Sequence, residues 1–142
     1  MRTRARDDAG NAAVELAPVA LIFILFLGLA IGAGRITITH MAVQAAARDA
    51  ARQASIARSP AAAQAAADSS ALAALRGDGL DCAPQVTVDT TGFSVPVGEP
   101  AQVSATVTCA VRLSDLTAVP GMPGSRALTA TFTSPLDPYR AR

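Results

Sequence analysis

The chain lacks the residue types from which most catalytic and metal sites are built. It contains no lysine and no tryptophan, and His40 is its only histidine. No cysteine or second histidine stands at metal-ligand spacing from His40. The one glycine-rich stretch, GLAIGAG, lies inside an apolar run, where small residues usually serve helix packing. We therefore expect no enzymatic activity, no metal, no cofactor and no small-molecule substrate.

A strong net charge is also missing. Twelve basic residues, all of them arginine, nearly balance eleven acidic residues and give a net charge of +1. Binding to nucleic acid depends on a basic surface, so we expect no nucleic-acid partner. Aromatic residues make up only 4% of the chain. Outside the apolar run they are Phe93, Phe132 and Tyr139, so a water-facing part of this chain has a thin core.

One long apolar run is present near the start of the chain. Residues 16–34, LAPVALIFILFLGLAIGAG, carry no charge and would form a helix of about 28 Å, close to the hydrocarbon thickness of a bilayer. A cleaved secretory signal also has a basic start, which MRTRAR supplies, but its apolar region is shorter. Small residues such as Ala30 and Gly32 still permit such cleavage. A buried soluble helix is disfavoured because LIFILFLGLAIG has no polar face. The pattern predicts a transmembrane helix over residues 11–34.

Helical periodicity continues after the apolar run without a break signal until Pro60. One face of this helix is rich in alanine and smooth enough for another helix or a sheet to approach closely. Another face is polar. We expect one rod from Ala12 to Ser59, about 70 Å long, with a local kink at Pro18. The alanine-rich face holds Val43, Ala46, Ala47, Ala50, Ala54 and Ala57, and the polar face holds Gln44, Arg48, Arg52 and Ser55.

A second helix is predicted to begin at Ser59-Pro60, with serine as its cap and proline in its first turn. It runs through AAAQAAADSSALAAL, and Gly77 is its stop signal. Residues 35–76 therefore form an alanine-rich helical region. The stretch GDGLD that follows is a turn.

Strand periodicity replaces helical periodicity from Gln85 onward. Three alternating runs are separated by loops rich in glycine and proline, TTGFSVPVGEPA and VPGMPGS. The pattern predicts an α+β protein in which residues 77–142 form a small antiparallel sheet with one buried face and one wet face. The inward residues are Val86 and Val88 in the first run; Val103, Ala105, Val107, Cys109, Val111 and Leu113 in the second; and Leu128, Ala130 and Phe132 in the third.

Cys82 and Cys109 are the only two cysteines, and both follow the apolar run. Cys109 falls on the inner face of the clearest strand, and Cys82 precedes the first strand. A disulfide between them would tie the turn before the sheet to the sheet. It would also place this part of the chain in an oxidising compartment outside the cytoplasm. The alternative is two buried free thiols in a cytosolic domain. Arginines on both sides of the span leave the orientation undecided by charge.

The residues before the apolar run resemble the processing signal of type IV pilins and pseudopilins. A short charged leader, residues 1–10, ends in Gly10; after a cut there, Asn11 would be the first residue and Glu15 the fifth. "GNAAVELAP" before a long apolar run is most similar to the TadE family of minor pilins and pseudopilins of tight-adherence pilus systems. Asn11 stands where type IV pilins often have phenylalanine, and Leu16 where an aromatic residue is frequent. The layout agrees over most of the chain, but only about the first 35 residues carry the resemblance specifically.

The resemblance implies a single-pass membrane protein that contributes to pilus assembly and adhesion. A prepilin peptidase would remove the leader after Gly10 on the cytoplasmic side, and other pilins or pseudopilins would be the partners. Glu15 would then pair with the new terminal amine of Asn11 in a neighbouring subunit. Alternatively, Glu15 lies in the headgroup region, near the first turn of a helix whose dipole favours an acid.

Two other functions fit the same sequence. A single-span anchor could present a small extracellular binding domain, and its leader would stay intact. Cleavage by a signal peptidase near Gly32 could instead release the domain. The position of the first residue of the mature chain separates these functions from a processed pilin.

Overall fold

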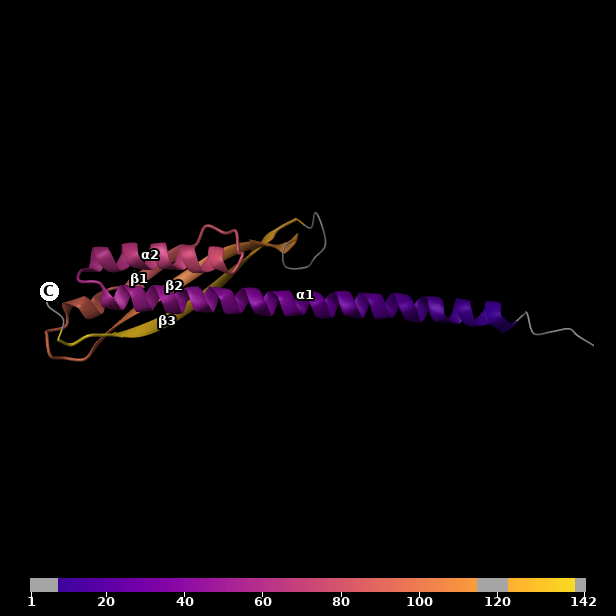
Figure 1. Ribbon diagram of the computed structural model, residues 1–142, viewed down its shortest axis with the longest axis horizontal. Helices are drawn as coiled ribbons and strands as arrows, with labels where there is room; N and C mark the ends of the chain where they lie inside the picture. Colours follow the sequence, from indigo (N-terminus) through magenta and orange to yellow (C-terminus); the bar gives the residue numbers. More distant parts are fainter. Residues whose placement is uncertain (1–7, 115–122, 140–142) are drawn as a thin grey trace, which may run out of the picture.

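The computed structural model describes residues 8–114 and 123–139, with side chains from Leu16 onward. A long helix, α1 (Asp8–Ile56), projects from a small head (Figure 1). The head contains the last part of α1, the helix α2 (Pro60–Gly77), and strands β1 (Gln85–Asp89), β2 (Ala101–Arg112) and β3 (Ser125–Leu136). A short 3-10 helix, η1 (Thr91–Ser94), follows β1. The predicted α+β architecture is confirmed.

Helix α1 has 49 residues, which corresponds to about 74 Å of helix. It begins four residues before the expected start, Ala12, and ends three residues before the expected end, Ser59. It continues through Pro18. The alanine face predicted for its second half is confirmed as far as Ala54, because Ala46, Ala47 and Ala50 are fully buried. Ala57, the last residue predicted on this face, lies beyond the end of the helix and is half-buried. The placement of Ser55 on the polar face is wrong. Ser55 is only 9% exposed, and its hydroxyl donates to the carbonyl of Arg52 at 2.8 Å, so no outside partner is needed.

Helix α2 begins as predicted and ends differently. The hydroxyl of Ser59 accepts a hydrogen bond from the backbone N–H of Ala62 at 3.2 Å, and Pro60 occupies the first turn. Gly77, predicted as the stop, is still helical. The left-handed residue is Gly79, with φ of 74°. Its N–H donates to the carbonyl of Arg76, and the N–H of Leu80 donates to the carbonyl of Leu75. These two bonds define a Schellman motif.

The three strands form one antiparallel sheet in the order β1-β2-β3. In β2 the inward residues predicted from Val103 to Val111 are buried, whereas Leu113 lies beyond the end of the strand. Strand β3 reaches Leu136, three residues past the predicted run, and pairs with β2 along its whole length. Phe132 lies on the inward side as predicted but is 39% exposed, because β3 is an edge strand and the head covers it only in part.

The head is a two-layer structure with one hydrophobic core. Helix α1 contacts β2 and β3, and α2 contacts β1, so the two helices lie side by side over the same face of the sheet (Figure 1). Alanines dominate the helix side of the core. Its largest fully buried side chains are those of Leu75, Val43, Val103, Val107 and Cys109. The small side chains let the layers approach closely, but they leave little apolar area to bury.

Candidate assembly site

The candidate processing and assembly residues lie at the start of α1. Gly10, Asn11 and Glu15 all belong to its continuous helical backbone, and their side chains fall outside those that the structure describes. The five residue steps from Gly10 to Glu15 correspond to about 7.5 Å along a helix axis. The predicted boundary between leader and span therefore lies within regular helix, since α1 begins at Asp8.

Beyond these residues α1 presents apolar side chains that no described part of the chain covers. The most apolar window of the helix has no buried residue, and large side chains are exposed around its whole circumference; for example, Phe26 is 68% exposed and Leu29 is 72% exposed. By length and composition this helix can cross a membrane. A continuous apolar surface of this kind is stable only against lipid or other apolar helices.

The transition from the exposed span to the packed head falls near Thr39. The hydroxyl of Thr37 donates to the carbonyl of Ala33 at 3.1 Å, and that of Thr39 donates to the carbonyl of Arg35 at 2.9 Å. Both hydroxyls are thus satisfied by their own helix four residues back. Thr39 is the first buried residue of the head along α1, so the uncharged run ends one turn before the head begins.

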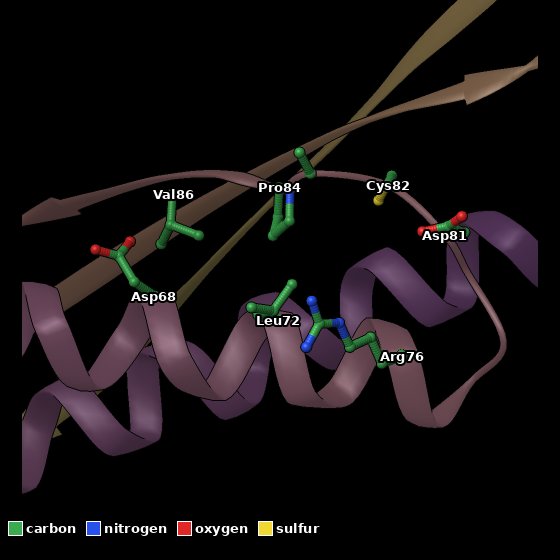
Figure 2. Close-up of a pocket in the computed structure, with 8 residues that line it drawn as sticks. Asp68, Leu72, Arg76, Asp81, Cys82, Pro84 and Val86 are labelled. Carbon is green, nitrogen blue, oxygen red and sulfur yellow. The ribbon is translucent and has the colours of Figure 1, made fainter.

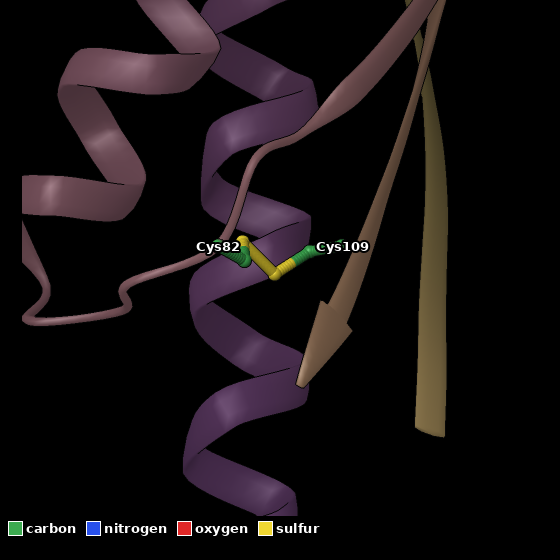
Figure 3. Close-up of a disulfide and its surroundings, with 2 residues drawn as sticks. All are labelled: Cys82 and Cys109. Carbon is green, nitrogen blue, oxygen red and sulfur yellow. A yellow bond between two sulfur atoms is a disulfide. The ribbon is translucent and has the colours of Figure 1, made fainter. Parts of the chain in front are cut away.

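A disulfide joins Cys82 to Cys109, with 5.9 Å between their Cα atoms (Figure 3). Cys109 is fully buried, and the bond lies beside α1, between the segment that precedes β1 and strand β2. It fixes the connection between α2 and the sheet. Neither cysteine is free.

A hollow of about 450 Å³ lies between α2 and the segment that carries Cys82 (Figure 2). Its charged residues are Asp68, Arg76 and Asp81, and all three are exposed. Across the described residues, no three histidine, cysteine, aspartate or glutamate side chains come together in a group that could hold a metal ion. His40 is exposed on α1, as expected for a residue just beyond the span.

Sequence reasoning missed the side chain that covers the outer edge of β1. Gln64 of α2 donates to the carbonyl of Val86 at 3.0 Å and accepts from the N–H of Val88 at 3.2 Å. Its amide therefore occupies the place of a neighbouring strand. Gln64 also donates to Asp68 at 2.9 Å. A glutamine within an alanine-rich helix gave no signal of this contact, because the contact joins elements more than twenty residues apart.

The family comparison agrees with the resemblance seen in the sequence. The family model for TadE-like proteins matches residues 10–52, which is the span and the first part of the head within α1. The match begins at Gly10, the predicted last residue of the leader. No curated protein and no solved structure matches the chain. The similarity therefore rests on α1, and α2 and the sheet have no counterpart from these comparisons.

Proposed function

We propose that the protein is a minor pilin or pseudopilin of a tight-adherence pilus system. The observation that carries the proposal is the TadE-like family match, which begins at Gly10 and covers residues 10–52. The exposed apolar helix supports it, because pilin-like subunits are held in a membrane, and later against one another, by such a helix. The family match by itself indicates association with a tight-adherence pilus.

The proposal divides the chain into four parts. Residues 1–10 are a leader that a prepilin peptidase removes, residues 11–34 span the membrane, residues 35–76 form the alanine-rich helical region, and residues 77–142 form the disulfide-linked sheet domain. The amino terminus is cytoplasmic and the head lies outside, where a disulfide is stable. After processing, the carboxylate of Glu15 pairs with the Asn11 amine of a neighbouring subunit, because a charge at the edge of a span needs a partner. The assembled protein contributes to adhesion.

Intact-mass measurement and amino-terminal sequencing of the membrane-extracted protein test the processing step. Coexpression with the cognate prepilin peptidase should yield a chain that begins at Asn11. Gly10→Leu should block the cut by crowding the peptidase site. Gly28→Leu is a matched control, because a side chain at Gly28 meets open space and the site of cleavage is untouched. A wild-type chain that keeps Met1 in the presence of active peptidase would favour the plain anchor, and a start near Gly32 would favour a secreted domain.

Association with other pilins tests the role of Glu15. Glu15→Ala and Glu15→Gln should both insert normally and be cleaved normally, yet both should cross-link less with the cognate pilus proteins. Asp49→Asn is the control, because it removes an exposed carboxylate from the head part of the same helix. Unchanged cross-linking in both Glu15 variants would leave Glu15 as a headgroup-region residue without a role in assembly.

A further inference from the structure

The two edges of the sheet differ in what covers them. At β1 the side chain of Gln64 occupies the backbone groups of Val86 and Val88. At the opposite side, β3 is bonded to β2 from Ser125 to Leu136, and no strand among the described residues pairs with its other edge. An edge strand presents a row of backbone donors and acceptors to any extended chain. Within the described part of the chain, the longest uncovered edge of this sheet is therefore that of β3.

The composition of β3 does not protect this edge. Natural edge strands are commonly blocked by charged residues or proline, or they are very short. Strand β3 has twelve residues, and the stretch 127–134, ALTATFTS, contains neither a charge nor a proline. Arg126 and Pro135 stand only at its two ends. A long, uncharged edge on an extracytoplasmic head is suited to strand addition.

A hollow of about 270 Å³ follows this edge between β3 and α1. It is lined by His40, Gln44 and Arg48, which recur every four residues along one stripe of α1, and by residues 129–132 of β3. Both inward and outward residues of β3 contribute to the lining, so the hollow wraps the edge of the strand. A strand added there would direct alternate side chains toward the stripe on α1.

The positive charge in the hollow predicts that the added strand carries a negative charge. The guanidinium of Arg48 lies over the ring of Phe132, 5.3 Å from its centroid, and this contact holds the cation beside β3. Among the described residues, no carboxylate lines the hollow. Asp49 is the next residue, but it is rotated by about 100° around the helix. An acidic side chain from an added strand would supply the missing counter-charge.

We propose that the β3 edge and the hollow beside Arg48 bind an extended acidic segment of a partner protein, which adds to the sheet as a fourth strand. A second copy of the chain fits poorly. Two copies in one membrane have parallel α1 helices, so their β3 strands would meet in parallel, the less stable pairing. The inference goes beyond pilus membership, because it names a binding surface on the head and the chemistry of its partner.

Binding of defined peptides to the full-length protein in nanodiscs tests this inference. The probe is a pool of blocked octapeptides with glutamate at alternate positions and threonine, valine or alanine elsewhere. Hydrogen exchange should slow at the β3 amides when the pool is added. A pool with glutamine in place of glutamate should bind about three- to fivefold more weakly, the upper part of the range expected for one exposed ion pair. A pool methylated on every backbone nitrogen should not bind, because it has no N–H group left to donate to β3.

Two variants assign the charge contact. Arg48→Gln should weaken binding of the glutamate pool by the same three- to fivefold and leave the glutamine pool unaffected. Arg58→Gln removes an exposed arginine that lies outside the hollow, and it should leave both affinities unchanged. Far-ultraviolet circular dichroism verifies that both variants fold. Absence of binding by the glutamate pool, equal binding to the two pools, or self-association through β3 in place of peptide binding would each overturn the inference. Each of these results is independent of cleavage at Gly10.

Discussion

The side-chain carbonyl of Gln64 accepts a hydrogen bond from the backbone N–H of Val88 across 3.2 Å. The amide nitrogen of the same side chain donates to the carbonyl of Val86. One glutamine on a helix thus satisfies a donor and an acceptor on the edge of a strand, and it fastens α2 to β1. The pair of bonds covers part of the β1 edge and leaves β3 as the longest uncovered edge of the sheet.

Gln64→Ala should destabilise the head by about 1–2 kcal/mol, because two backbone groups of β1 lose a partner. Urea unfolding of the full chain in detergent measures the change, and hydrogen exchange should accelerate at Val88 in particular. Gln53→Ala is the control, because Gln53 is exposed on α1 and the substitution changes the helix propensity in the same way. Equal stabilities for the two variants would show that water replaces the Gln64 amide without loss.

The end of α2 depends on Gly79 rather than Gly77. Gly79→Ala should destabilise the head by about 1 kcal/mol, because it places a β-carbon on a residue with φ of 74°. Gly77→Ala should be neutral or stabilising by roughly 0.5–1 kcal/mol, because Gly77 is helical and open space surrounds it. Thermal or urea unfolding of both variants gives the comparison. The reverse order of stabilities would contradict the assigned cap.

The alanine seam between the helices and the sheet should not accept larger side chains. Ala50 is fully buried, so Ala50→Leu should cost about 1–3 kcal/mol through overpacking. Ala65 is exposed on α2, and Ala65→Leu should change the stability by less than about 0.5 kcal/mol. Unfolding midpoints of the two variants test this. An unchanged unfolding midpoint for Ala50→Leu would mean that the helices and the sheet can move apart without a loss of stability.

The disulfide should contribute much of the stability of the head. It joins residues 27 apart in sequence, for which the loop-entropy treatment gives about 3.5 kcal/mol. The double variant Cys82→Ala with Cys109→Ala should therefore unfold at much lower urea concentration than the oxidised wild type, and reductant should have no further effect on it. Peptide mapping of protein taken from cells under non-reducing conditions should recover the linked pair. Two alkylatable thiols in untreated protein would place the head in the cytoplasm.

The sequence predicted those parts of the fold that depend on local pattern. The apolar run, the Ser59 cap and the alternation in β2 each follow from neighbouring residues, and the structure agrees with them. The sequence did not predict which glycine would adopt positive φ, because Gly77 and Gly79 both satisfy the local signal. Nor did it predict the contacts of Gln64 or Arg48, which depend on how α1 and α2 lie across the sheet. At the candidate assembly site, Gly10, Asn11 and Glu15 came from resemblance alone, and their roles are still predictions.

Asp89 is the last residue of β1. The backbone N–H of Thr91, 3.0 Å from the carboxylate, and then the side chain of Thr91 lower the pKa of Asp89 below its ordinary value. A lowered pKa in the folded state means that the ionised carboxylate stabilises the fold. That stabilisation is complete above the unfolded pKa and is lost as the pH falls through the folded pKa.

Carbon-detected NMR titration of the Asp89 carboxyl should therefore give a lower midpoint in the folded protein than in urea. Thr91→Val removes the hydroxyl and keeps the backbone N–H, which is the larger cause, so most of the lowering should persist. Asp89→Asn should lower the free energy of unfolding of the head at neutral pH. Its difference from wild type should shrink as the pH falls, because the wild-type carboxylate becomes protonated. A folded midpoint equal to or above the unfolded one would contradict the hydrogen bond, and a full loss of the shift in Thr91→Val would assign it to the hydroxyl.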